Sequence, residues 1–234
     1  MKGWAILFLL CWGRLFAQDT GKAQSIDDAA TDYFQHVSHY SVLYYGDLQK
    51  GYPSTINHPY LQEEAFAGAR LSYIRTVYPD VLLRLDICRD ELIVQSPTNR
   101  SIVLFPENVD FAELHGYRII YFQSDALPSS PSSGYYFQLY SGRCKVMEKR
   151  NAVLQEKPLL NEIERHFLFS THYYLFKDDA YYSIKNKRGL LKALSPYKKE
   201  LKQYISSNRL NYRKNPELLL KKTVEAYEKL IEAL

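Results

Sequence analysis

The sequence predicts an α+β fold: an antiparallel β-meander, in one version curled into a half-barrel, followed by a C-terminal helical pair. The chain of 234 residues contains 21 tyrosines and is 15% aromatic, and tyrosine favours half-buried sheet surfaces. Short alternating segments joined by turns fill the middle of the chain, which is typical of antiparallel strands. From Lys187 onward the apolar residues follow a helical period instead.

Residues 1–17 have the pattern of a signal peptide. Lys2 supplies the positive start, an apolar run follows from Trp4 to Trp12, and Ala17 offers a small residue for cleavage. The run is about half of the ~20 residues that a membrane-spanning helix needs. A lipid anchor at Cys11 is the alternative, although leucine rather than a small residue precedes that cysteine. We expect cleavage after Ala17 and export of the rest.

Composition and charge narrow the classes of partner. The chain is 46% apolar and 24% charged, which is typical of soluble globular proteins and excludes disordered, collagen-like and coiled-coil classes. Cleavage removes Lys2 and Arg14, so that 28 of the 30 basic residues face 26 acidic ones, a net charge of +2. This balance argues against a nucleic-acid partner. No segment after residue 17 is long and apolar enough to predict a transmembrane span.

Residues 18–38 are polar and rich in alanine, and we expect a tether or a short helix there. Residues 39–186 form the predicted β-rich domain. Within it, residues 124–134 are the clearest loop, and a less regular segment around Pro158 precedes the last hairpin. Strand patterns cover residues 41–53, 69–79, 81–87, 92–96, 101–106, 109–122 around Gly116, 135–150 and 171–185.

Residues 187–234 form the predicted helical segment, packed on the sheet. Ser195–Pro196 and Asn215–Pro216 each match an N-cap followed by proline at the first helical position. The apolar positions before, between and after these caps follow a helical period of three to four residues, which predicts one buried face per helix. They are Leu190, Leu191, Leu194, Leu201, Tyr204, Ile205, Leu220, Val224, Tyr227, Ile231 and Leu234.

Cys88 and Cys144 remain after cleavage. In an oxidising compartment they could pair, and closing so long a loop would stabilise the fold by ~4 kcal/mol in the chain-entropy model. Strand parity argues against the pair, because Cys88 shares a face with Arg84 and Asp86 while Cys144 shares one with Val146. Two unpaired, small apolar side chains are the alternative.

Several runs resemble an uncharacterised family of exported, β-rich proteins of Bacteroidota. They are YYGDLQKGYP, VLLRLDICRDELIVQSP, GYYFQLYSGRCKVMEKR and YYLFKDDAYYSIKNKRGLLKAL, and the resemblance extends over residues 40–230. It implies a periplasmic or outer-membrane-associated location, and it supplies no catalytic residues. The chain departs from the family at Cys88 and Cys144, where the resemblance implies other residues.

The sequence offers little support for catalysis or for a metal. Asp32, His36 and His39 are spaced to share one helical face, as zinc ligands would, but we favour a solvated amphipathic segment or a flexible tether, because no later motif supplies further ligands. The motifs of serine hydrolases, nucleotide-binding loops and zinc proteases are absent. We expect no cofactor and no metal. An enzyme whose site is assembled from distant residues is the alternative, and its candidates are His58, His115, His166, Asp86, Asp90 and Glu91.

Four Tyr-Tyr doublets give the first candidate binding surface. Neighbours in a strand point to opposite faces, so each doublet places one ring on each side of the sheet. If one face is open, its tyrosines offer an apolar body with a polar tip that suits a glycan or a protein partner. If both faces are covered, the rings only pack. The candidate ligand-binding residues are Tyr45, Tyr136, Tyr174 and Tyr182.

The C-terminal helices give the second. Their basic residues, represented by Lys198, Lys199 and Lys202, form a cationic face that could contact lipid headgroups or an acidic partner. The alternative is the solvated side of an amphipathic helix. Together these features favour a non-catalytic binding module of the cell envelope, with an envelope protein or glycan as partner and with peripheral membrane contact. A structural subunit of an envelope complex remains a further alternative.

Overall fold

A computed structural model describes residues 42–125, 127, 129–160 and 163–232. The structure divides after residue 42, and residues 43–234 contain every element described below. The expected signal peptide, the expected tether at 18–38 and the candidate ligands Asp32, His36 and His39 therefore lie outside the described residues.

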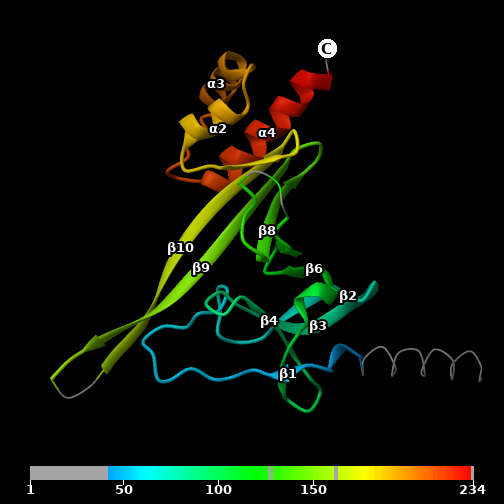
Figure 1. Cartoon of the computed structure of the whole chain (residues 1–234), viewed down its shortest axis with the longest axis vertical. Coiled ribbons are helices and arrows are strands. Elements are labelled where there is room, and N and C mark those ends of the chain that lie inside the picture. Colours follow the sequence, from blue (N-terminus) through cyan, green and yellow to red (C-terminus); the bar gives the residue numbers. More distant parts are fainter. Residues whose placement is uncertain (1–41, 126, 128, 161–162, 233–234) are drawn as a thin grey trace, which may run out of the picture. The chain divides into compact units, whose positions relative to one another are not determined.

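The predicted α+β fold with a meander and a helical end is confirmed (Figure 1). All strand pairs are antiparallel, and the open sheet has the order β1-β5-β4-β3-β2-β6-β7-β8-β9-β10-β11. The strands are β1 (Asp47–Leu48), β2 (Ala67–Tyr73), β3 (Thr76–Asp86), β4 (Glu91–Gln95), β5 (Ser101–Val103), β6 (Val109–Leu114), β7 (Tyr117–Phe122), β8 (Gly134–Ser141), β9 (Lys145–Pro158), β10 (Ile163–Lys177) and β11 (Ala180–Ser183). Two pairs of neighbouring strands are not consecutive in sequence, β1 beside β5 and β2 beside β6, and β6 follows a short 3₁₀ helix at Pro106–Asn108.

The prediction of one strand over residues 69–79 is wrong, because the chain turns there. Ile74 and Arg75 both adopt positive φ, 49° and 61°, and they join β2 to β3 in a two-residue hairpin. Turns with two positive φ angles match the twist of the flanking strands, and they usually contain asparagine and glycine. Isoleucine and arginine do not signal such a turn, so the alternating pattern concealed it.

The less regular segment expected around Pro158 is also wrong, because it belongs to two long strands. β9 and β10 pair from Phe176–Lys145 to Ile163–Pro158, and Figure 1 shows them as a long ribbon leading away from the helices. Proline is tolerated at Pro158 because it ends the strand, where a missing N–H costs little. We call residues 151–160 and 163–171 of this hairpin the arm.

The C-terminal segment contains three described helices rather than two: α2 (Lys187–Ala193), α3 (Lys198–Ser207) and α4 (Pro216–Glu232). Ser195 is not the N-cap of α3, because Tyr197 has that position, and the Ser195 N–H donates to the Lys192 carbonyl at the end of α2. α3 begins instead after Tyr197. The cap at Asn215 is confirmed, since its Oδ1 accepts the N–H of Leu218 at 2.9 Å. No described helix is long and apolar enough to cross a membrane.

Two apolar clusters cover the two faces of the sheet at β8–β10. The buried residues of α2, α3 and α4 pack on one face, where they meet Val146 and Leu175. On the other face Tyr136 and Met147 pack against Phe122, Leu127 and Tyr181. Since Val146 and Met147 are adjacent in β9, their opposite environments follow from strand alternation.

Candidate binding surfaces

The helical segment has a large excess of basic over acidic residues. Residues 185–232 contain thirteen lysines and arginines against five glutamates, a net charge of +8, whereas the whole chain has +4. Lys222 is half-buried and the other twelve are exposed. We call these twelve the cationic face: Lys185, Lys187, Arg188, Lys192, Lys198, Lys199, Lys202, Arg209, Arg213, Lys214, Lys221 and Lys229.

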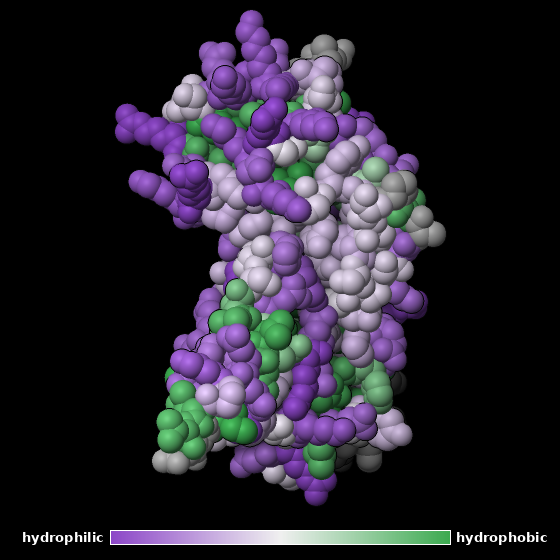
Figure 2. Space-filling model, turned by 60° about the vertical axis from the view of Figure 1, so that its left-hand side comes forward, coloured by the Kyte–Doolittle hydropathy of each residue, from purple (hydrophilic) through white to green (hydrophobic). Residues whose placement is uncertain are grey.

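The amphipathic pattern of α3 places three of these lysines outward. Leu201 and Ile205 are buried in the cluster beneath the helices, so Lys198, Lys199 and Lys202 fall on the exposed side. Figure 2 shows hydrophilic side chains projecting from the upper end of the molecule, with apolar surface between them. Lys198 and Lys202 are four residues apart, a like-charge spacing that disfavours a helix by about 0.2–0.5 kcal/mol. The helix tolerates this cost through its apolar packing.

Among the described residues, no acidic side chain pairs with the cationic face. The one ion pair within this segment joins Lys222 to Glu225, at 2.8 Å, and Lys222 is not part of that face. Two of the five glutamates point to the strands instead: Glu217 contacts Arg150 of β9, and Glu228 contacts the β8–β9 turn. Glu200 and Glu232 are exposed in the same segment, so they offset only a small part of the exposed positive charge.

Glu228 shows how α4 is attached to the sheet. It is 7% exposed, and it accepts hydrogen bonds from the Tyr140 hydroxyl at 2.7 Å and from the Cys144 N–H at 2.6 Å. The bond to Glu228 raises the pKa of Tyr140 to about 12. Gly142 lies so close to the same carboxylate that a Cβ there would collide with it. The turn therefore accommodates the helix because residue 142 has no side chain.

A second buried network lies below α4. Arg150 donates from Nε to Glu148 at 2.6 Å and lies 3.2 Å from Glu217, with its guanidinium over the rings of Tyr117 and Phe137. Burial raises the pKa of Glu148, against the lowering effect of Arg150. Both charges are paired and hydrogen-bonded, as buried charges in proteins must be, and the network joins β9 to the start of α4.

The candidate tyrosines do not form one open face. Tyr136 has no exposed surface and lies edge-to-face with Tyr174, at a centroid distance of 6.0 Å. Tyr182 is half-buried against the helical cluster. Tyr45 alone of the four is exposed, at 75%. Because the helices and the Phe122 cluster cover both sides of β8–β10, the doublets there are placed to pack across strands.

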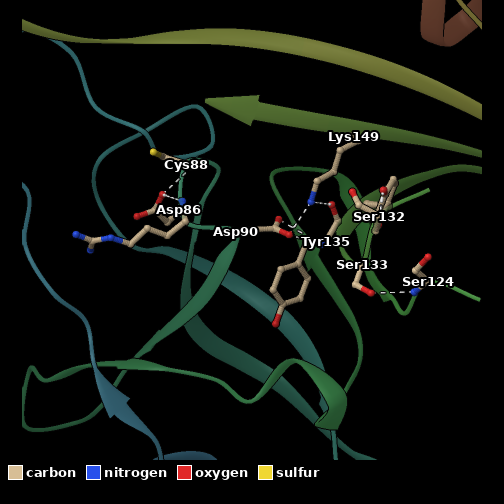
Figure 3. Close-up of polar contacts among 10 residues, drawn as sticks. Asp86, Cys88, Asp90, Ser124, Ser132, Ser133, Tyr135 and Lys149 are labelled. Atoms are coloured by element: carbon tan, nitrogen blue, oxygen red, sulfur yellow. Dashed lines mark hydrogen bonds and ion pairs between the residues drawn. The ribbon is translucent and has the colours of Figure 1, made fainter. Parts of the chain in front are cut away.

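The charged turn between β3 and β4 reaches β9, as Figure 3 shows. Asp90 binds the Lys149 ammonium at 2.6 Å and accepts the Tyr135 N–H, while Lys149 also donates to the Tyr135 carbonyl at 3.0 Å. Burial lowers the pKa of Lys149, and burial likewise raises that of Tyr135. Glycine is required at Gly134 because a Cβ would collide with the ion pair. Lys149 lies between Glu148 and Arg150 in β9, and nothing in its local sequence indicates that Asp90 is its partner.

Asp86, at the end of β3, organises the turn that follows. It has no exposed surface, and its carboxylate accepts the N–H groups of Cys88 and Arg89 and the hydroxyl of Tyr52. Burial and this hydrogen bond raise the pKa of Tyr52. All of these partners are structural groups of the turn or of the segment packed on it, so the carboxylate has a positioning role (Figure 3).

Of the candidate acids and histidines of the enzyme alternative, His58 is separated in sequence from the others and lies beside Arg84. A cavity of about 390 Å³ beside Arg84 is lined by one of them, His58. The Cζ atom of Arg84 lies 3.9 Å from the ring centroid of Tyr60 and 4.3 Å from that of Phe66. The guanidinium also donates a hydrogen bond to Oε1 of Gln49 at 2.7 Å. These contacts immobilise the guanidinium, which argues against a role that requires it to move.

Neither a disulfide nor a metal cluster occurs in the described part of the chain. Cys88 and Cys144 are both free thiols, which agrees with the alternative of two unpaired cysteines. No group of three or more histidine, cysteine or acidic side chains is arranged to hold a metal ion among the described residues.

Comparison with known proteins adds no assignment. No protein-family model, no curated protein and no solved structure matches the chain. The resemblance to exported Bacteroidota proteins therefore stays a prediction.

Proposed function

We propose that this protein is an exported, non-catalytic binding module of the cell envelope that attaches to an anionic membrane surface through its cationic face. The observation that carries the proposal is the set of twelve exposed cations on residues 185–232, none of them paired with an acidic side chain among the described residues. Export rests on the signal-peptide pattern of residues 1–17.

The charge is large enough for peripheral attachment. A lysine or arginine near an anionic bilayer contributes about 1 kcal/mol. If half of the cationic face contacts the surface at once, the sum is about 6 kcal/mol, which corresponds to an apparent dissociation constant of tens of micromolar. Such attachment weakens as salt rises, because exposed charges are screened over about 8 Å at physiological ionic strength.

The experiment is co-sedimentation of the mature chain with vesicles of phosphatidylcholine, with and without phosphatidylglycerol. The triple variant Lys198→Gln, Lys199→Gln and Lys202→Gln removes three adjacent cations from α3. We expect wild-type protein to sediment with the anionic vesicles alone, and the variant to bind about 100-fold more weakly, since three cations contribute about 3 kcal/mol.

The matched control removes the same charge from the sheet. Arg75, Arg100 and Lys157 are exposed, and a triple glutamine variant at these positions lowers the net charge equally. Equal loss of binding in both triple variants would show that net charge, rather than the cationic face, is responsible. Binding to double-stranded DNA stronger than to the anionic vesicles would contradict the membrane assignment. Export is tested separately, by N-terminal sequencing of protein from the envelope fraction, with Gln18 as the expected first residue.

A further inference from the structure

The outer edge of β10, on the side away from β9, is occupied at both ends and open between them. At one end Asn57 binds the backbone of Phe167 twice, accepting its N–H at 2.7 Å and donating to its carbonyl at 3.0 Å, and Ile56 donates to the Arg165 carbonyl. At the other end Ile184 donates to the Tyr173 carbonyl, and β11 pairs with residues 174–177.

These contacts identify which backbone groups face outward. Residues 165, 167 and 173 all use their outward groups, and backbone direction alternates along an antiparallel strand. Phe169 and Thr171 therefore also direct an N–H and a C=O outward. Within the described part of the chain nothing pairs with these four groups. An open edge of this kind is a template for another strand.

The side chains around this opening are exposed and uncharged. Residues 168–172 are all exposed, and Leu168 and Phe169 are 50% and 52% exposed. Leu168 pairs across the ladder with Val153 of β9, which is 64% exposed. Proteins usually protect an open edge with lysine, proline or a bulge. Residues 167–176 contain no lysine and no proline. We call residues 168–172 the open edge.

A second copy of the same edge does not fit into this opening. β11 and residues 56–57 project beyond the edge on either side, so the opening is a recess about five residues long. If two copies approached edge to edge, the β11 of each would lie where the β10 of the other must be, because paired strands are only about 4.8 Å apart. A single extended segment of another polypeptide avoids this collision.

We propose that the open edge of β10 is a binding site for an extended, uncharged peptide segment of a partner protein, which adds a strand to the sheet. The segment exchanges hydrogen bonds with the backbone of Phe169 and Thr171, four in all. Its alternate side chains lie beside Phe169 on one face of the sheet and beside Leu168 and Val153 on the other. The protein itself already uses the adjoining parts of the same edge: the backbone of Ile184 binds Tyr173, and the side-chain amide of Asn57 binds the backbone of Phe167.

The test uses a fluorescent peptide of alternating valine and threonine with lysine at each end. Its control is the same peptide N-methylated at every residue, which removes the donors of both edges. We expect the first to bind the mature chain in fluorescence anisotropy and the second not to bind. In amide exchange followed by NMR, the peptide should protect the N–H of Phe169 and Thr171. The N–H groups of Leu168 and Ser170 face β9 and should not change.

Thr171→Pro removes an outward N–H that no described group accepts, and proline is tolerated at such edge positions. We expect it to weaken peptide binding about ten-fold, the effect of one net hydrogen bond, while Thr171→Val binds as the wild type does. No binding at millimolar peptide, equal binding of the N-methylated peptide, or a wild-type dimer that Thr171→Pro dissociates would each overturn the proposal. The lysine variants of α3 should leave peptide binding unchanged, so this test fails or succeeds independently of membrane attachment.

Discussion

Asp90→Asn tests how far one buried ion pair holds the β3–β4 turn to β9. The Lys149 side chain is 7% exposed and that of Asp90 is 30% exposed, with 2.6 Å between Nζ and Oδ2. Asparagine keeps an oxygen for the Tyr135 N–H, so the substitution removes the charge and little else. It leaves the Lys149 ammonium with the Tyr135 carbonyl at 3.0 Å and the Tyr136 ring at 5.0 Å.

The expected loss of unfolding free energy follows from this burial. Removing one partner of a fully buried pair costs about 3–5 kcal/mol, because an uncompensated charge stays behind. Since Asp90 is about one third exposed, water screens part of its interaction. We therefore expect a loss of about 2–3 kcal/mol.

The loss should depend on pH with a definite sign. Burial already lowers the pKa of Lys149 in the folded protein, and removal of Asp90 lowers it further. Between the folded pKa and the unfolded value of about 10.4 the unfolded chain binds more protons, so stability rises with pH in that window. In the variant the window opens at lower pH. The difference in stability between wild type and variant should therefore narrow as pH rises toward 10.

The assay is urea unfolding at several pH values, with Glu113→Gln as the control. Glu113 pairs with Arg118 at 2.9 Å, but both side chains are about 40% exposed, and such surface pairs contribute about 0–1 kcal/mol. A loss in Asp90→Asn no larger than the loss in Glu113→Gln would refute the reasoning, as would a difference that widens toward high pH.

Two further predictions concern single groups. Cys144 is 3% exposed, and burial raises its pKa to about 11. Iodoacetamide at pH 8 should therefore alkylate the half-buried Cys88 first. Mass spectrometry measures the order of labelling, and faster labelling of Cys144 would contradict its burial. Asn215→Ala removes the cap of α4 and should lower the unfolding free energy by about 1 kcal/mol, while Asn215→Ser should cost little; equal losses in thermal unfolding would mean that the Leu218 N–H does not depend on the cap.

Much of the fold could be predicted because local patterns and tertiary packing agree. Alternation in residues 81–87 and the Asn215–Pro216 cap each describe what the chain does, and β3 and α4 lie where these patterns placed them. The errors come from positions where the side chain gives no local signal. Ile74 and Arg75 form a two-residue turn whose usual sequence signal is Asn-Gly. The arm is stabilised by pairing between β9 and β10, which the sequence of either strand alone does not reveal.

The candidate surfaces divide in the same way. The lysines of α3 could be found from sequence, because helical period alone separates Lys198 and Lys202 from Leu201 and Ile205. The tyrosine doublets could not be assigned, because whether a ring packs or is exposed depends on what covers each face of the sheet. The open edge could not be predicted at all. It exists only because Asn57 and β11, distant in sequence, stop short of each other on β10.

β10 runs from the open edge to the sheet beneath the helices that carry the cationic face, and the two proposed surfaces differ in physical character. Tyr173 and Leu175 pack beneath the helices, whereas Thr171, two residues earlier and about 7 Å along the strand, is exposed. One surface attracts through charge and weakens with salt; the other binds through backbone groups and apolar side chains, which salt screens little. Because the open edge carries no charge, rising ionic strength should release the protein from anionic vesicles and leave a bound peptide in place. A single strand thus connects the two proposed binding surfaces, and their binding can be measured separately.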